Sequence, residues 1–362
     1  MEKQSNDAKK PKKQHSAPAR NWVGDNGKII EPLFADYFLS LHPMRCFQGR
    51  LFTVDGMIED EASLKKKIYE QIRYYATTSV ARRIEHIMQA IKLACASEPP
   101  EIQTDRIHVR NGTYFVDGHF TPEKEYCMNR LPIAYVPEAP APTRWLQFLN
   151  ELLYEEDIPA LQEYIGYCLL PVTKAQKMLL MVGKGGEGKS RIGLILRELF
   201  GNSMYTGSLQ KVETNRFARA DLEYKLLLVD DDMKTEALPQ TNNIKTLVTL
   251  EDKIDIERKG QQSVQGTLYV RFACFGNGSL HALYDKSNGF YRRQLLLTTK
   301  EKPVGRVDDP FLIDKMRGEK EGILLWALEG LHRLIRNNYQ FTISERTAAN
   351  LKEAMEQGNN IL

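Results

Sequence analysis

The sequence predicts an α/β fold with a parallel central sheet, preceded by a mostly helical accessory domain. Two patterns carry this prediction. An apolar run over 178–182 leads into a glycine-rich turn and then into apolar residues at helical spacing up to Phe200, which is typical of a buried parallel strand followed by a helix. Upstream, residues 61–96 carry apolar side chains at three- and four-residue spacing, as helices with one buried face do.

Length and composition indicate a globular protein of more than one domain. The chain has 362 residues, of which 42% are hydrophobic and 27% charged, so it can bury a sizeable core. No apolar run approaches the roughly 20 residues of a membrane span, and the N-terminus lacks the apolar segment of a secretory signal. The 5 cysteines are scattered without metal-ligand spacing. We therefore expect a cytoplasmic protein with no membrane partner and no zinc site.

The net charge of +3 is small, but its distribution is uneven, because lysines cluster in residues 1–20. This stretch is low in apolar residues, so we predict a disordered, solvated tail in preference to a specific DNA-binding arm. The remainder is close to neutral. Any nucleic-acid contact of the folded body must therefore come from local basic patches.

Four segments follow from the composition and the turn signals. Residues 1–20 are the basic tail, and residues 21–143 form the accessory domain. This domain combines the helices of 61–96 with a β-hairpin element over 106–120, where two Gly-containing turns separate short alternating strands. Residues 144–309 form the core with the parallel sheet. Residues 310–362 form a C-terminal helical segment.

Within the core, further strands are expected after the glycine-rich turn. Residues 225–232 form an apolar strand that ends in aspartates, and 241–250 form a short helix. Alternating residues over 254–256 and again over 268–272 predict a hairpin with Lys259 near its turn. The next strand ends at Asn277. A loop over 287–293 then leads into a strand over 294–299 and a helical stretch over 310–339.

The glycine-rich turn predicts a phosphate-binding loop. Its residues match G-x-x-x-x-G-K-[ST] and follow a strand, so backbone N–H groups can turn toward phosphate oxygens at the positive end of a helix. Lys189 is expected to reach the β- and γ-phosphates of ATP, and Ser190 the Mg²⁺ ion. A chance glycine loop is the alternative. The predicted nucleotide contacts are Gly183, Lys184, Gly185, Gly186, Glu187, Gly188, Lys189 and Ser190.

Polar residues at later strand ends complete a candidate catalytic site. Asp230 and Asp231 are placed to hold Mg²⁺ and to accept a proton from the attacking water, and Asp232 competes for either role. Asn277 is a candidate for orienting that water. The pair Arg292 and Arg293 suits an arginine finger supplied by a neighbouring subunit; a solvated basic pair is the alternative.

The order of these motifs resembles superfamily 3 helicases, in particular phage and plasmid primase-helicases. The resemblance lies in the segments GKGGEGKS, LLLVDDD, IKTLVTLEDKIDIERK, FACFGN and FYRRQLLL, and upstream in RIHVRNGTYFVDGHFTPEKEYCMNRLPIAYVP and FLNELLYEEDIPALQEYIGYCLL. It implies an AAA+-like P-loop NTPase core, a homo-hexameric ring, and ATP-driven 3′-to-5′ translocation on single-stranded DNA. It also implies that Arg258 and Lys259, with Lys253 nearby, grip the DNA backbone at a pore hairpin.

The chain departs from this family in two respects. A run of aspartates stands where a glutamate is frequent, which leaves the base unassigned. No polymerising primase domain fits in the N-terminal region, so a separate primase or origin-binding protein is an expected partner besides forked DNA. A loader or initiator ATPase that does not unwind DNA is the alternative function, and a DNA-binding scaffold with a vestigial nucleotide site is a third.

Overall fold

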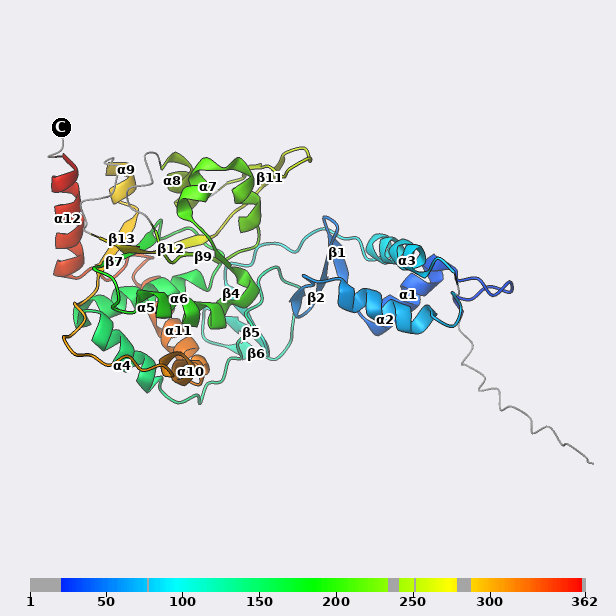
Figure 1. Cartoon of the computed structure of the whole chain (residues 1–362), viewed down its shortest axis with the longest axis horizontal. Coiled ribbons are helices and arrows are strands. Elements are labelled where there is room, and N and C mark those ends of the chain that lie inside the picture. The colour runs from blue at the N-terminus through cyan, green and yellow to red at the C-terminus, as the bar shows by residue number, and fades with distance from the viewer. Residues whose placement is uncertain (1–20, 77, 234–240, 251, 279–287, 360–362) are drawn as a thin grey trace, which may run out of the picture. The chain divides into compact units, whose positions relative to one another are not determined.

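The computed structural model (Figure 1) describes residues 21–76, 78–233, 241–250, 252–278 and 288–359. The predicted tail, residues 1–20, lies outside them. The chain divides into two compact units, the first made of Met1–Thr53 and Met57–Pro99, and the second of Val54–Gly56 and Pro100–Leu362. Each unit has its own hydrophobic core and is described separately.

The first unit is mostly helical, as the sequence predicts. Its helices are α1 (Glu31–Leu41), α2 (Ala62–Ile72) and α3 (Val80–Ala94), and its strands β1 (Arg45–Phe47), β2 (Arg50–Thr53) and β3 (Gly56–Met57) follow that order in one sheet. The predicted helical stretch is thus two helices. Trp22, Phe34 and Phe38 pack in the core with Ile68 of α2 and Ile91 of α3, because apolar residues three and four positions apart share a helix face.

The second unit contains the predicted parallel sheet. Its strands are β7 (Met178–Gly183), β8 (Met204–Thr206), β9 (Leu227–Asp230), β12 (Arg271–Asn277) and β13 (Gln294–Thr298). They lie in the order β13-β7-β12-β9-β8, and every neighbouring pair is parallel. The expected α/β fold is therefore confirmed. Strand β12 lies between the strand that leads into the glycine-rich loop and the strand that ends in aspartates.

Both faces of this sheet are covered by helices. Along β7, Leu179 and Met181 join one hydrophobic cluster, whereas Met178, Leu180 and Val182 join the other, because successive side chains of a strand point to opposite faces. The first cluster takes α4 (Thr143–Leu152), α5 (Ile158–Cys168), α6 (Lys189–Phe200), α10 (Leu312–Arg317) and α11 (Lys320–Arg336). The second takes α7 (Leu209–Thr214), α8 (Asn242–Val248), α9 (Asn288–Tyr291) and α12 (Glu345–Asn359).

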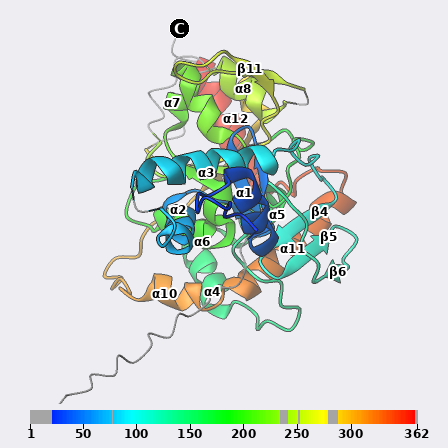
Figure 2. The same cartoon turned by 90° about the vertical axis from the view of Figure 1, so that its right-hand side faces the viewer.

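The two helical layers lie on opposite sides of the sheet (Figure 1), and Figure 2 shows α7, α8 and α12 well separated from α4, α10 and α11. Three short 3-10 helices lie in the connections: η1 (Glu155–Asp157) between α4 and α5, η2 (Gly201–Ser203) between α6 and β8, and η3 (Arg216–Leu222) between α7 and β9. Helix α12 belongs to this layer because Asn350 donates to the carbonyl of Leu296 on β13 at 3.2 Å. The C-terminal segment is therefore part of the core of the second unit.

Two predicted elements differ from the structure. The antiparallel strands β4 (Arg106–Val109), β5 (Gly112–Phe115) and β6 (Phe120–Thr121) belong to the second unit, which begins at Pro100 and not at residue 144. Tyr114 contacts His332 of α11 there, with 3.1 Å between the phenol oxygen and Nε2.

The later hairpin pairs β10 (Ile254–Ile256) with β11 (Val264–Gly266). The predicted return strand over 268–272 instead leads into β12. Side chains on both faces of this stretch are buried.

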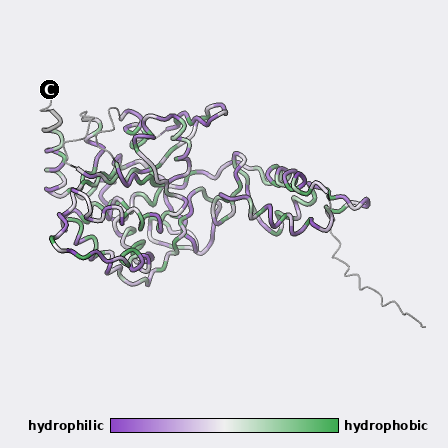
Figure 3. The backbone as a smooth tube through the Cα atoms, in the orientation of Figure 1, coloured by the Kyte–Doolittle hydropathy of each residue, from purple (hydrophilic) through white to green (hydrophobic). Residues whose placement is uncertain are grey.

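Hydrophobic and hydrophilic residues alternate along the backbone of both units (Figure 3). Within the part of the chain that the structure describes, no helix combines the length and hydropathy needed to cross a bilayer. The alternation follows from the packing, since most elements bury one face and expose the other.

Candidate nucleotide site

The glycine-rich loop connects β7 to α6, as the motif predicts. Gly188 precedes the helix with φ of +117°, a left-handed conformation that residues with a Cβ rarely adopt. Gly183 has a different requirement. A Cβ there would lie 2.2 Å from Thr299 Oγ1 and 2.9 Å from Lys189 Nζ, so the close approach of the lysine depends on a residue without a side chain.

Lys189 is held within the loop by Glu187. The Nζ of Lys189 lies 2.8 Å from Oε2 of Glu187, and the other carboxylate oxygen accepts the N–H of Gly185 at 2.7 Å. Both side chains are buried, with 6% and 3% of their surface exposed. Burial alone raises the pKa of Glu187, but the hydrogen bonds from Lys189 and the backbone outweigh burial and lower that pKa. The carboxylate is thus ionised and neutralises the lysine.

A cavity of about 220 Å³ opens above this loop. It brings together four residues that the sequence assigns to one site, namely Lys189, Ser190, Asp231 and Asn277. They meet because β7, β9 and β12 are parallel and neighbouring, so their carboxyl ends lie at one edge of the sheet. The amide oxygen of Asn277 lies 3.7 Å from the position that a Cβ on Gly185 would take. The cavity therefore combines residues of the glycine-rich loop with a carboxylate.

The aspartates that follow β9 have different surroundings. Asp231 lines the cavity, whereas the buried carboxylate of Asp230 accepts the N–H of Leu209, the first residue of α7, at 2.7 Å. Burial raises the pKa of Asp230. Asp232 does not line the cavity. The structure thus places Asp231, and not Asp230 or Asp232, in the cavity with Lys189.

Two residues of the site carry no signal in the sequence. Arg306 and Asp308 line the same cavity, although they follow β13 in an irregular segment. The guanidinium of Arg306 donates to the carbonyl of Glu187 at 3.2 Å and to that of Gly186 at 3.3 Å, and it pairs with Asp308 at 3.0 Å. The exposed Lys184 pairs with Glu301 of the same segment. No motif marks Arg306, because it binds backbone carbonyls more than a hundred positions away.

A divalent metal would find few protein ligands here. Among residues 21–76, 78–233, 241–250, 252–278 and 288–359, no group of three or more His, Cys, Asp or Glu side chains is arranged to hold one. The hydroxyl of Ser190 and the carboxylate of Asp231 face the same cavity. This donor set fits Mg²⁺, which commonly takes one or two protein oxygens and completes its shell with phosphate and water.

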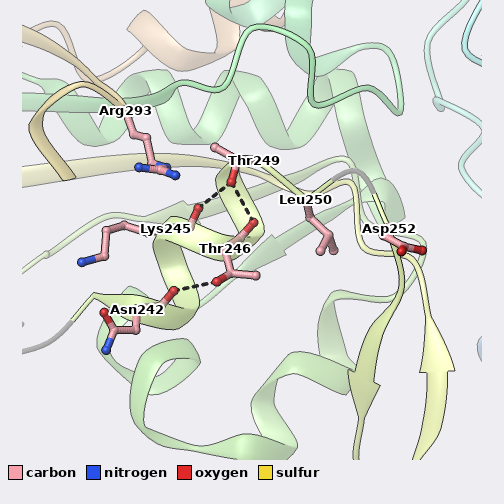
Figure 4. Close-up of a pocket in the computed structure, with 7 residues that line it drawn as sticks. All are labelled: Asn242, Lys245, Thr246, Thr249, Leu250, Asp252 and Arg293. Carbon is pink, nitrogen blue, oxygen red and sulfur yellow. Dashed lines mark hydrogen bonds between the residues drawn. The ribbon is translucent and has the colours of Figure 1, made fainter. Parts of the chain in front are cut away.

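Arg292 and Arg293 lie at the other end of the sheet. The carbonyl of Arg293 accepts the N–H of Met178, where β7 begins, so the length of β7, about 20 Å at the usual rise per residue, separates these arginines from the loop. Arg293 lines a different cavity of about 480 Å³ with Lys245, Thr246 and Thr249 of the α8 region (Figure 4). Burial, and then the charge of Arg292, lowers the pKa of Arg293. The chain's own loop and arginines thus do not meet.

The predicted DNA-contacting residues lie on and beside the β10–β11 hairpin. Lys259 and Lys253 are exposed, and Gly260 supplies the turn with φ of +74°. Arg258 instead forms an ion pair with Glu223, a side chain that is only 6% exposed. Lys259 is therefore presented to solvent, whereas Arg258 is engaged with the body of the second unit.

Two families match parts of the chain. Residues 181–293 match a family of unknown function (DUF5906), and residues 39–153 match the family described as D5 N terminal like. The first match includes the phosphate loop, Asp231, Asn277 and both arginines. No curated protein matches the sequence.

Solved structures share the fold of this chain. The A-form apo structure of the NrS-1 C-terminal region is 13% identical, with 89% of this chain and 75% of that chain covered and a TM-score of 0.54. Another apo structure of the same region is 15% identical, with 90% and 75% covered and a TM-score of 0.58. At these identities the likeness concerns the fold. Neither the D5 match nor this shared fold extends to superfamily 3.

Proposed function

We propose that this protein is an ATP hydrolase that drives DNA unwinding, as a superfamily 3 helicase of a phage, plasmid or other mobile element. The observation that carries the proposal is the single cavity in which Lys189, Ser190, Asp231 and Asn277 meet. A lysine and helix N-terminus for phosphate, an oxygen pair for Mg²⁺ and an amide beside them are the parts that phosphoryl transfer to water requires.

In this mechanism the loop binds the triphosphate and Lys189 moves from Glu187 to the β- and γ-phosphates. Ser190 and Asp231 would hold Mg²⁺, which would neutralise charge that develops on the phosphates. Asn277 orients the attacking water, and a carboxylate of the aspartate run accepts its proton. Arg292 or Arg293 of a neighbouring copy stabilises the transition state. Supply of this arginine by a neighbour requires a ring of copies, and the resemblance implies six subunits.

DNA contact is proposed at the hairpin that carries Lys259. A basic side chain at an exposed turn suits a phosphate contact without sequence preference. Translocation then couples movement of the hairpin to ATP turnover between subunits, in the 3′-to-5′ direction of the family. A separate primase or origin-binding protein would complete the replication machinery.

The test measures ATP turnover and strand displacement on a tailed duplex. Wild-type protein is expected to do both, and Lys189→Ala to do neither, with Lys174→Ala as a matched lysine control away from the cavity. ATP turnover without displacement on either 3′- or 5′-tailed substrates would favour the loader over the helicase. Absence of nucleotide binding by the wild type would overturn the proposal.

A further inference from the structure

Two helices of the first unit carry a local excess of positive charge. Residues 61–94, which contain α2 and α3, hold 7 Lys or Arg against 3 Glu, an excess larger than the net +3 of the whole chain. Two of the glutamates already have basic partners, since Glu61 pairs with Lys92 and Glu85 with Lys65. The other basic side chains of α2 and α3 therefore form a local patch of the kind that a nucleic-acid contact requires.

The two ion pairs also fix how α2 and α3 run beside each other. The pair of Lys65 with Glu85 joins the middle of both helices at 2.6 Å, and the other pair joins the start of α2 to the end of α3 at 2.7 Å. The helices are therefore antiparallel. Tyr69 lies one turn after Lys65, and Arg82 lies one turn before Glu85, so both lie along the seam that this ion pair marks.

Two exposed tyrosines lie among the basic residues of this seam. Tyr69 is 45% exposed and Tyr74 is 74% exposed. On α2, Lys66 lies one turn before Tyr69, and Arg73 lies one turn after it. The guanidinium of Arg73 lies 4.7 Å from the centre of the Tyr74 ring and donates to its hydroxyl at 2.7 Å. Lys66, Arg73 and Arg82 are exposed, and within the described part of the chain they form no ion pair.

Exposed rings between unpaired basic side chains have the chemistry that single-stranded nucleic acid requires. The basic groups contact phosphates, and the ring faces stack on bases, which are accessible only where the strand is unpaired. A duplex would hide its base faces, and an acidic protein would leave the tyrosine rings without a specific partner. The combination of charge and rings therefore favours a single strand.

We propose that the seam between α2 and α3 binds single-stranded DNA, and that it does so without nucleotide. The seam site consists of Lys66, Tyr69, Arg73, Tyr74 and Arg82. The tyrosines stack on bases, while the lysine and the arginines contact phosphates. This site belongs to a different unit from the hairpin of Lys259, and it does not depend on the proposed nucleotide site.

The experiment compares a short labelled oligothymidine with an abasic oligonucleotide of the same length, which has the phosphates and lacks the bases. Binding of both is measured by fluorescence anisotropy without nucleotide. The full chain carries Lys259→Ala throughout, so that the hairpin contact does not mask the seam site. Into this background Tyr74→Ala, Tyr74→Phe, Arg82→Gln and Arg50→Gln are introduced separately. Arg50 is an exposed residue of β2 in the same unit, so it is the matched control.

We expect Tyr74→Ala to weaken oligothymidine binding about tenfold, as for loss of one stacked base, without changing abasic binding. Tyr74→Phe keeps the ring and should stay within about twofold on both ligands. Arg82→Gln should weaken both ligands and reduce the salt slope of log affinity by about 0.7, as for one phosphate of a single strand. Arg50→Gln should change neither.

Three results would overturn the proposal. Tyr74→Ala could bind oligothymidine as Arg50→Gln does, which would exclude stacking at the seam. An equal loss on both ligands would mean that the bases are not contacted. Competition by poly-glutamate as strong as that by unlabelled oligothymidine would assign the surface to an acidic protein. Failure of the proposed ATPase would leave these measurements unaffected, because no nucleotide is present.

Discussion

The basic residues at the two ends of the parallel sheet have different surroundings. At the carboxyl end of β7, Lys189 is buried and neutralised by Glu187 at 2.8 Å. At the amino end, Arg293 donates to the carbonyl of Gly289, and within the described residues no ion pair involves Arg292 or Arg293. One end holds a buried lysine paired with a carboxylate, and at the other end no acidic partner of the arginines occurs among the described residues.

This difference indicates how the chain divides its proposed chemistry. A buried charge without a partner is costly, so a half-buried arginine of this kind is suited to a ligand that brings negative charge from outside. The phosphates bound by a second copy would do so. In the proposed ring a single chain would carry halves of two different sites, and turnover would depend on assembly.

The largest expected effect concerns the arginine end. Arg293→Ala, and separately the more exposed Arg292→Ala, should show which side chain acts, with a loss of about 10³- to 10⁵-fold in ATP turnover for that one. Nucleotide binding should persist, because neither residue touches the loop. Mixing Arg293→Ala with Lys189→Ala should restore part of the activity, since some interfaces regain both intact halves. Turnover that is independent of protein concentration would contradict assembly between copies.

The next effect tests the loop end. Asp231→Asn should lower ATP turnover by about 10²- to 10⁴-fold, because a carboxamide does not carry the negative charge that would hold Mg²⁺. Asp232→Asn is the matched control, since Asp232 is exposed and lies outside the cavity. Steady-state turnover at saturating ATP is the measurement. An equal loss of ATP turnover in the two variants would contradict the different roles assigned to Asp231 and Asp232.

A smaller effect is expected for the ion pair between Glu187 and Lys189 in the glycine-rich loop. Glu187→Gln keeps an acceptor for Gly185 but leaves Lys189 without its countercharge, so the free energy of unfolding should fall by about 1–3 kcal/mol. Nucleotide affinity should rise several-fold, because phosphate no longer competes with the carboxylate. Urea unfolding and calorimetry measure the two quantities.

The same pair predicts a pH dependence. Because the pKa of Glu187 is lowered from its ordinary value of 4.5 in the folded chain, its contribution to stability is present above pH 4.5 and is lost as the pH falls through the lowered value. The difference in unfolding free energy between wild type and Glu187→Gln should therefore shrink below pH 4.5. A difference that stays constant down to acidic pH would mean that the charge is not involved.

The smallest effect concerns the hairpin. Lys259→Ala should weaken binding of single-stranded DNA several-fold and reduce the salt slope of log affinity by about 1, as for loss of one phosphate contact. Gln261→Ala, at the same exposed turn, should change neither. Arg258→Ala should behave differently and lower stability, because Glu223 would lose its partner.

The local sequence pattern was enough to predict the glycine-rich loop. It did not predict the residues from distant parts of the chain that contact the loop. The eight residues from Gly183 to Ser190 are contiguous, so their strand, turn and helix could be read from spacing. Arg306 could not, because its partners are carbonyl oxygens that any residue supplies. The hairpin was placed correctly near Lys259, but its return strand was wrong because Tyr269 and Arg271 are buried as well as Val270, and period 2 does not identify a strand buried on both faces.

The position of β12 between β7 and β9 has a consequence for the order of folding. β12 is made after both of its neighbours, so during synthesis the loop and the aspartates are present before the strand that joins them. The cavity at the loop can therefore close only when residues up to Asp308 have emerged, and this non-local step is intrinsically slow. We expect protection of β7 and β9 amides from hydrogen exchange to appear together, and late, during refolding; early protection of either strand alone would contradict this. The chain would then acquire its affinity for phosphate only once the sheet is complete.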